Sequence, residues 1–238
     1  MAAGGRILAL THAHLRAKVR AGMSTGELDR IAEDFIRSHD GAVPAFKGLY
    51  GFPGAICISV NDEIVHGIPS PKRVLVEGDI VKLDVGVQYQ GMFTDAAITV
   101  PVGTVDPSTI RLIDVTERAL DAGIAQAVPD NYVGDIGNAV QQVVERAGFS
   151  VVRELVGHGV GHQPHEDPQV PNHGKPRRGT RLQAGLTIAI EPMVNLGGPA
   201  TRTLGDKWTV VTLDGTRSAH VEHTVAITDD GPRVLTRL

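Results

Sequence analysis

The chain has 238 residues, of which 27 are acidic and 23 basic, giving a formal net charge of −4. Its 42% of apolar residues is too high for a disordered protein, and no apolar run approaches the roughly 18 residues of a membrane span. The mild acidity disfavours DNA binding, and the single cysteine, Cys57, permits no internal disulfide. Because the N-terminus also lacks the pattern of a signal peptide, we expect a cytoplasmic protein with no membrane contact.

The N-terminal part of the chain predicts two helices followed by strands. Ser24 and Glu27 have the spacing of a capping box, and the apolar residues after them repeat as on one face of a helix that ends near Gly41. The preceding segment, 7–19, is also predicted to be helical. Strands are predicted over the ranges 55–60, 63–66, 80–87 and 93–100.

The C-terminal part repeats this order. Asp106 and Pro107 are typical of a helix start, and a second helix is predicted over 133–147. Strands are predicted over 151–156, 186–191, 208–212 and 219–227. The order predicts one α+β domain over 1–238, with a mainly antiparallel sheet, helices on one face and two similar halves, roughly 1–105 and 106–238.

Asp84 and Asp95 lie on two strands that the sequence predicts to form a hairpin. A turn over Gln88 to Gly91 would pair positions whose numbers sum to 179, so the two aspartates would lie directly opposite each other. Opposed residues have Cβ atoms about 4.5–5.5 Å apart, where two like charges repel unless a cation neutralises them. A divalent ion such as Mn, Fe, Co, Mg or Zn suits hard oxygen ligands. The alternative is two unrelated surface aspartates near a turn.

Glu191 and Glu222 lie in predicted strands whose other residues are largely apolar, as is typical of strands in a protein core. A carboxylate there is costly unless it is paired or coordinated, although an edge strand with one solvated face would accommodate either residue alone. His158 stands between glycines that allow close approach, and it is the natural nitrogen ligand beside four carboxylates. Such a set could hold two metal ions that activate a bridging water, which is hydrolase chemistry.

His66 and His165 are the remaining histidines with a candidate role. Either could stabilise an oxyanion or donate a proton, and either could equally be a loop residue without a role. We assign no role to His162 and His173. Motifs of phosphate binding, dinucleotide binding and serine hydrolysis are absent, and Cys57 is expected to line a pocket rather than act as a nucleophile.

Several motifs along nearly the whole chain resemble those of the type I methionine aminopeptidases. Asp84 and Asp95 have the family spacing of ten intervening residues. The other matching motifs are Ser24-Thr25-Gly26-Glu27-Leu28-Asp29, Cys57-Ile58-Ser59-Val60-Asn61, Val65-His66-Gly67-Ile68-Pro69, Gly157-His158-Gly159-Val160-Gly161, His165-Glu166-Asp167-Pro168, Ile190-Glu191-Pro192-Met193 and Val221-Glu222-His223-Thr224. Their combination and order are specific to this family.

The resemblance implies a pita-bread fold with two pseudo-symmetric halves around a dinuclear metal centre. It implies Asp84, Asp95, His158, Glu191 and Glu222 as ligands of two divalent ions (Co, Mn, Fe or Zn), with Asp95 and Glu222 bridging them. It also implies His66 and His165 as catalytic residues that contact the substrate, and Glu191 as a proton shuttle. The implied reaction is removal of the initiator methionine, by a hydroxide between the metals, from nascent proteins and peptides with a small second residue.

The resemblance also places a methionine pocket, in which this chain departs from the family. Leu49 and Phe52 stand where tyrosines are usual, Pro164 replaces a phenylalanine, and His220 replaces a residue that is commonly glutamine. Cys57 and Trp208 are retained, while His66 and His165 complete the substrate-binding set. Further expectations are a monovalent cation near Asn61 and Ser218, docking on the ribosome, and a monomeric chain.

Two other readings of the same residues remain open. A prolidase-like or aminopeptidase P-like enzyme would share the fold and cleave before proline, although such relatives usually carry an additional N-terminal domain. A silent pita-bread module that binds protein or nucleic acid would usually have lost metal ligands, and here none is lost.

Overall fold

The computed structural model describes residues 1–238 as four helices and fifteen strands. The helices are α1 (Ala2–Arg16), α2 (Thr25–Arg37), α3 (Pro107–Ile124) and α4 (Val133–Arg146). The strands are β1 (Ala42–Pro44), β2 (Cys57–Val60), β3 (Glu63–Val65), β4 (Ile80–Tyr89), β5 (Met92–Pro101), β6 (Ser150–Val151), β7 (Gly157–Gly159), β8 (Glu166–Val170), β9 (Thr187–Ile190), β10 (Met193–Asn195), β11 (Thr201–Thr203), β12 (Val210–Thr212), β13 (Ser218–His220), β14 (His223–Thr228) and β15 (Gly231–Val234). A single 3-10 turn, Leu49–Gly51, follows β1.

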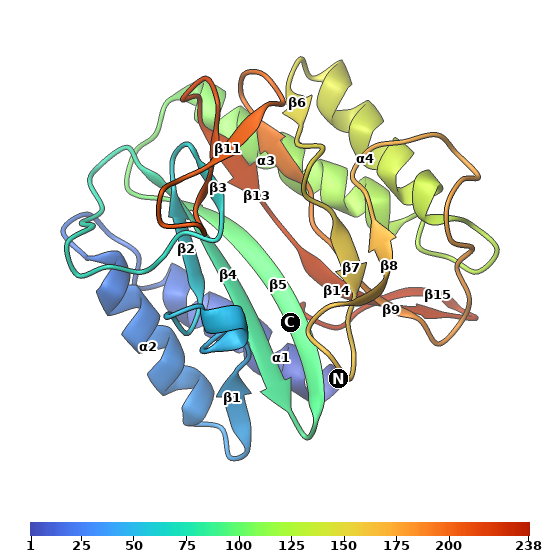
Figure 1. The fold of residues 1–238 in the computed structure, drawn as a ribbon, viewed down its shortest axis with the longest axis horizontal. Helices are drawn as coiled ribbons and strands as arrows, with labels where there is room; N and C mark the ends of the chain where they lie inside the picture. Colours follow the sequence, from blue (N-terminus) through green and yellow to red (C-terminus); the bar gives the residue numbers. More distant parts are fainter.

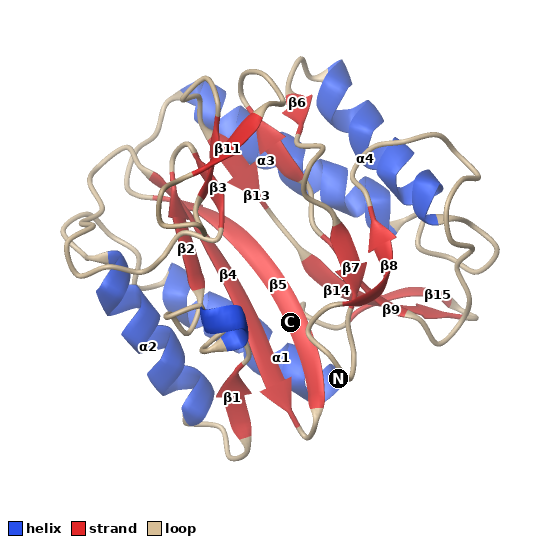
Figure 2. Cartoon of the chain, in the orientation of Figure 1, coloured by secondary structure: helices blue, strands red, loops and turns tan.

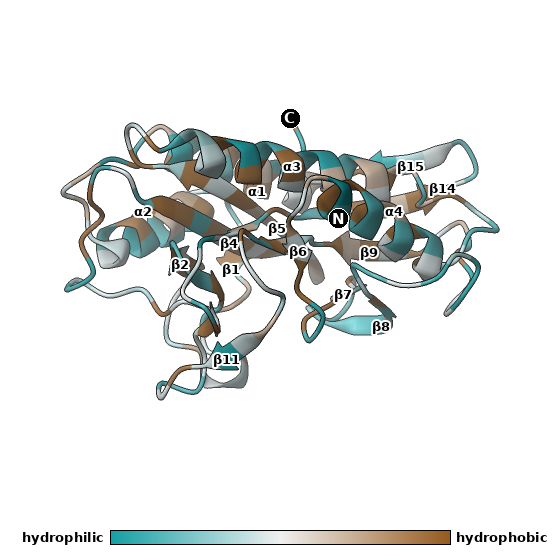
Figure 3. Ribbon diagram, turned by 90° about the horizontal axis from the view of Figure 1, so that it is seen from above, coloured by the Kyte–Doolittle hydropathy of each residue, from teal (hydrophilic) through white to brown (hydrophobic).

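The helices gather on one side of the strands, as predicted. Figures 1 and 2 place α1 behind the β4–β5 hairpin, α2 beside β1 and β2, and α3 and α4 beside the C-terminal strands. Figure 3 shows the helices along one side, while β7, β8 and β11 project on the other. Every pairing between the strands is antiparallel, which confirms the α+β prediction. No helix combines the length and apolarity needed to cross a membrane.

The helix starts follow the sequence signals closely. Ser24 accepts a hydrogen bond from the Glu27 N–H while Glu27 accepts one from the Ser24 N–H, so the capping box is confirmed. The first helix begins at Ala2, earlier than predicted. Its first turn was not predicted because it contains Gly4 and Gly5, and glycine has a poor helix propensity. A Cβ on Gly5 would come within 2.1 Å of the Leu235 carbonyl oxygen, so tight packing requires a glycine here despite its poor helix propensity.

The predicted hairpin exists, but its register differs from the prediction by two residues. Gln90 and Gly91 both adopt positive φ, of 50° and 76°, and form a two-residue turn centred one residue later than predicted. The paired numbers therefore sum to 181, so that Asp84 lies opposite Ala97 and Asp95 opposite Gly86. The two aspartates are diagonal neighbours on the same face of the sheet, because a shift of two positions preserves the alternation of side chains.

Several predicted strands are shorter in the structure, and two of them, 151–156 and 219–227, are broken. The range 219–227 contains a break at Val221 and Glu222, between β13 and β14. Of the range 151–156, only the first residue belongs to β6. At both breaks the chain changes its neighbouring strand, from β10 to β9. The alternation of side chains within one strand does not predict such a change. The proposed boundary between halves near residue 105 stays a prediction.

The N-terminal and C-terminal strands meet along a seam between β5 and the break that precedes β14. Ala97 and Glu222 exchange two backbone hydrogen bonds, with Ala97 N–H donating at 3.3 Å and Glu222 N–H at 2.9 Å. The Thr224 hydroxyl accepts from the Asp95 N–H at 2.9 Å and donates to the Asp95 carbonyl at 2.7 Å. The Thr99 hydroxyl forms the corresponding pair of bonds with His220. Buried threonines on both strands thus fix the relative position of the two sets of strands.

Replacing Thr224 with valine tests the seam. Thr224→Val keeps the shape but leaves two buried backbone groups of Asp95 without partners, which should lower the free energy of unfolding by about 2 kcal/mol. Thr228→Val, on the same strand, removes only one bond to the Gly231 carbonyl near a turn and should cost about 1 kcal/mol or less. Urea unfolding of the metal-free proteins measures both values, and equal losses would contradict a special role for the seam.

Candidate metal centre

Four carboxylates from four different parts of the chain converge where the strands meet. Asp84 comes from β4, Asp95 from β5, Glu191 from the residue directly after β9, and Glu222 from the break before β14. Ligand atoms of Asp84, Asp95 and Glu222 all lie within 4.8 Å of one another. The same holds for His158, Glu191 and Glu222, so the structure brings together all five predicted ligands.

The carboxylates are almost inaccessible to water, and three of the four have an oxygen without a hydrogen-bond partner in the protein. The side chains of Asp95, Glu191 and Glu222 are 7%, 13% and 3% exposed. One oxygen each of Asp84, Asp95 and Glu222 is buried without any hydrogen bond. Orphaned acceptor oxygens of this kind are costly, and divalent cations are the partners they lack. The donor set therefore fits divalent metal.

Burial raises the pKa of every carboxyl in the cluster. It raises the pKa of Asp84 to about 7, and it raises those of Asp95, Glu191 and Glu222 well above their ordinary values. The mutual repulsion of the carboxylates adds to the effect for Asp95, Glu191 and Glu222. Without a cation the cluster therefore retains protons at neutral pH.

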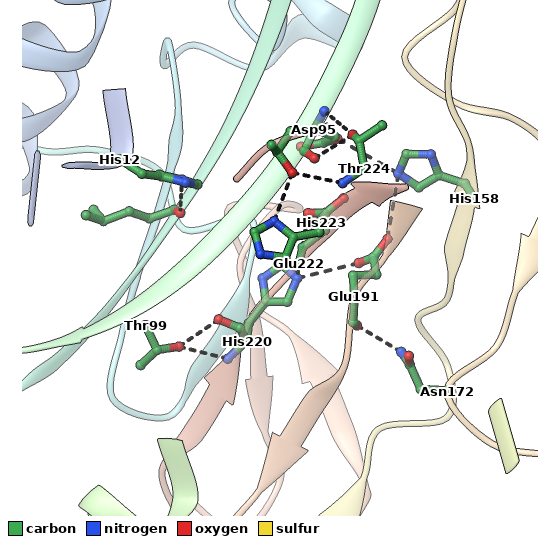
Figure 4. Close-up of polar contacts among 12 residues, drawn as sticks. His12, Asp95, Thr99, His158, Asn172, Glu191, His220, Glu222, His223 and Thr224 are labelled. Atoms are coloured by element: carbon green, nitrogen blue, oxygen red, sulfur yellow. Dashed lines mark hydrogen bonds and ion pairs between the residues drawn. The ribbon is translucent and has the colours of Figure 1, made fainter. Parts of the chain in front are cut away.

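His158 is oriented by its own strand so that one nitrogen faces the carboxylates (Figure 4). Its Nδ1 lies 2.8 Å from the Gly159 carbonyl oxygen, which can only accept, so Nδ1 carries the proton. The free Nε2 lies 3.6 Å from Glu191 and 3.9 Å from Asp95. Burial lowers the pKa of His158 to about 4, which keeps the ring neutral and able to bind metal.

A cavity of about 280 Å³ opens onto the cluster. The predicted substrate residues Leu49, Phe52, Cys57, His66, His165 and Trp208 all line it. Pro164 does not: it is buried outside the cavity wall. Six further residues, which were not predicted, also line the cavity: Phe46, Tyr50, Val65, Leu155, Val156 and Met193. Three of them had a signal: Val65 and Met193 belong to recognised motifs, and Tyr50 lies beside the expected pocket residue Leu49.

One side of the cavity is a compact apolar wall. Phe46, Phe52 and Cys57 form a buried cluster against which Leu49 and Trp208 pack. The Phe52 and Trp208 rings meet edge to face, with centroids 5.1 Å apart. Burial raises the pKa of the Cys57 thiol well above its ordinary value, so the thiol stays neutral. This agrees with the prediction that Cys57 lines a pocket.

His66 and His165 stand over the carboxylate cluster from different loops. The His165 ring centroid lies 4.5 Å from that of His158, and His66 lies 6.5 Å from Trp208 with the rings perpendicular. Burial lowers the pKa of both histidines, and for His66 the neighbouring His165 contributes as well. Both rings are therefore neutral at physiological pH. His162 and His173 lie outside the cavity wall.

The site near Asn61 and Ser218, where a monovalent cation was expected, already contains the amine of Lys82. The fully buried Lys82 Nζ donates to the Asn61 carbonyl at 2.7 Å, and the Ser218 N–H donates to the same oxygen at 3.1 Å. Both acceptor positions of that oxygen are thereby used by donors of the protein, one of them the Lys82 amine, whose pKa burial lowers to about 7. These residues do not fit the expected ion.

Comparison with known proteins places this arrangement in a family. A profile described as metallopeptidase family M24 matches residues 1–229. Methionine aminopeptidase 1 of Bacillus subtilis is 51% identical over 238 residues, which span 100% of this chain and 95% of that protein. The crystal structure of a methionine aminopeptidase from Thermotoga maritima is similar with a TM-score of 0.98 and 42% identity, covering 100% of this chain and 95% of that one.

A more distant likeness concerns the fold alone. Prolidase from Pyrococcus furiosus has a TM-score of 0.81 at 20% identity, and the match covers 100% of this chain but 63% of that one. The chain belongs to metallopeptidase family M24 and has the pita-bread fold. Relatives that it matches over nearly their full length include methionine aminopeptidases of Bacillus subtilis and Clostridium perfringens.

Metal binding should be coupled to proton release. The folded pKa of Asp84 is about 7, above the ordinary 3.8, so its proton stabilises the metal-free fold below about pH 4 and that stabilisation is lost as pH rises through about 7. A cation must displace this proton at lower pH. We therefore expect Mn affinity to rise about tenfold or more from about pH 6 to about pH 8. Calorimetry in buffers of different ionisation enthalpy measures the protons released, and a pH-independent affinity would contradict the coupling.

Asp95→Asn should have opposite effects on the two states of the protein. The amide keeps the shape but needs no proton on folding, whereas Asp95 is ionised in the unfolded chain and must be protonated when it is buried, so the metal-free variant should be more stable than the parent by about 1 kcal/mol or more near pH 8. Metal binding should fall by more than the about 10–100-fold that loss of a supporting residue costs. Asp229→Asn, in an exposed turn, is the control for both measurements. Unchanged metal content in Asp95→Asn would exclude Asp95 as a ligand.

Proposed function

We propose that this chain is a methionine aminopeptidase that holds two divalent cations and removes the initiator methionine from peptides with a small second residue. The observation that carries the proposal is the position of five metal-ligand side chains beside an apolar pocket in one cavity. The side chains that would hold the cations are Asp84, Asp95, His158, Glu191 and Glu222. The bound cations would supply Lewis-acid activation of water and of the scissile carbonyl.

The apolar wall is the natural site for the methionine side chain. Leu49, Phe52, Cys57 and Trp208 present carbon and sulfur surface, which suits an unbranched thioether and excludes water from it. Leu49 and Phe52 carry no hydroxyl, so recognition there depends on shape and apolar contact. With the side chain in this pocket, the first peptide bond would face the carboxylates and the two histidines that share the cavity.

The neutral histidines would act at the scissile amide. His66 and His165 can each donate an N–H toward the carbonyl oxygen or the amide nitrogen, where charge develops during attack. Glu191 would take a proton from the attacking water and pass it to the leaving amine. The Asn172 side chain fixes the Glu191 backbone by donating to its carbonyl oxygen at 2.9 Å.

The choice of ion and the biological partners belong to the same proposal. Carboxylate and imidazole ligands accept Co, Mn, Fe or Zn, and availability decides among them. The substrates would be N-terminal peptides of nascent proteins in the cytoplasm, met by a monomeric enzyme docked at or near the ribosome.

A peptide-release assay tests the function. The chelator-treated protein is supplied with Co, Mn, Fe or Zn and offered Met-Ala, Met-Gly, Met-Leu and Xaa-Pro peptides. We expect methionine release from Met-Ala and Met-Gly, little from Met-Leu and none from Xaa-Pro, and a chelator should stop the reaction. Cleavage of the Xaa-Pro peptides alone would favour the prolidase alternative, and no cleavage with any metal would refute both.

His165→Ala separates catalysis from metal binding. Because His165 is proposed to act on the substrate, its loss should lower kcat/KM for Met-Ala peptides by about 10²–10⁴-fold while the metal content stays unchanged. His162→Ala, three residues away and outside the cavity, should retain the parent rate. If both variants kept the parent rate, His165 would have no catalytic role.

A further inference from the structure

His220 is a fully buried histidine that the proposed mechanism does not use. It ends β13, opposite Met193 of β10, and its side chain is 1% exposed. The Thr99 hydroxyl holds its backbone on both sides, accepting from the His220 N–H at 3.0 Å and donating to the His220 carbonyl at 2.7 Å. These bonds fix the backbone from which the ring extends, next to the carboxylate cluster (Figure 4).

Neither nitrogen of the His220 ring has a hydrogen-bond partner. The other fully enclosed imidazole, His12, differs in this respect, since its Nε2 lies 3.1 Å from the Leu83 carbonyl oxygen. A buried polar group without a partner costs about 1–3 kcal/mol, so an orphaned imidazole needs an explanation. A ring with a packing role alone would be replaced by an apolar side chain at no loss.

The oxygens that His220 faces belong to two of the proposed metal ligands. Its Nε2 lies 3.7 Å from Glu191 Oε2 and 4.0 Å from Glu222 Oε2. An adjustment of about 1 Å would bring one of these contacts into the hydrogen-bond range. The two glutamates come from segments far apart in the chain, one directly after β9 and the other directly before β14, so a single donor between them would restrain both parts of the site at once.

We infer that His220 is a positioning residue for metal binding. It donates its Nε2–H to the ligand carboxylates Glu191 and Glu222, fixes their orientation and strengthens their hold on divalent cations. Carboxylates that bind metal are themselves commonly hydrogen-bonded by a surrounding layer of residues. The imidazole does not enter the cavity wall, so it acts on the substrate only through the glutamates. The inference rests on the proposed function, since both need a metal at this cluster.

The test measures metal affinity rather than activity. Apoproteins of the parent and of His220→Leu, His220→Gln and His12→Leu are titrated with Mn²⁺ by calorimetry, and their folded state is checked by circular dichroism. We expect His220→Leu to weaken Mn²⁺ binding about 10–100-fold. His220→Gln should recover most of this affinity because its amide can donate, and His12→Leu should bind as the parent does. His220→Phe replaces the leucine variant if the latter does not fold.

A second readout distinguishes positioning from direct ligation. The visible absorption of Co²⁺ bound to His220→Leu should keep the parent band positions, because all five proposed ligands remain. Parent-like Mn²⁺ affinity in His220→Leu would overturn the inference. So would a Co²⁺ spectrum of His220→Leu whose shifted bands show that one nitrogen ligand of the parent has been lost. If the parent binds metal and releases methionine but His220→Leu has parent affinity, only this inference fails. If the parent binds no divalent cation, the proposed function fails with it.

Discussion

Four acidic side chains share one buried site, and the rest of the structure depends on how their repulsion is resolved. Burial and mutual repulsion both oppose ionisation of Asp95, Glu191 and Glu222, so the metal-free protein retains protons there. Divalent cations resolve the same problem without protons, and this is why the fold of an M24 metallopeptidase can keep four carboxylates in its interior. Stability and metal binding are therefore coupled in this protein.

The carboxylates can meet only because the strands are tied together directly beneath them. Thr99 and Thr224 each form two buried hydrogen bonds across the seam, one next to His220 and the other next to Asp95. Two threonines that look ordinary in the sequence thus fix the distance between the candidate ligand Asp95 on β5 and the candidate ligand Glu222 before β14. The inferred contact of His220 with Glu191 and Glu222 would extend the same restraint from the backbone to the ligand side chains.

The hairpin and the pocket illustrate how far local patterns reach. Alternation in β4 correctly assigned Asp84 to the face shared with Asp95, although the turn lies one residue later than predicted, because alternation is insensitive to a shift of two. The pocket was less accessible to prediction. Phe46, Leu155 and Val156 reach the cavity from segments without a motif, while Pro164 does not line it. Their positions depend on loop paths that no local periodicity encodes.

The sequence by itself determined the helices with capping signals and the α+β class, and it predicted the five candidate ligands, because each leaves a local pattern or a motif of chemically special residues. Only the tertiary structure decided the hairpin register, the break at Glu222, the amine of Lys82 beside Asn61 and the unpartnered ring of His220. These features depend on contacts between residues far apart in the chain, where burial and geometry, rather than residue type, decide which polar groups find partners.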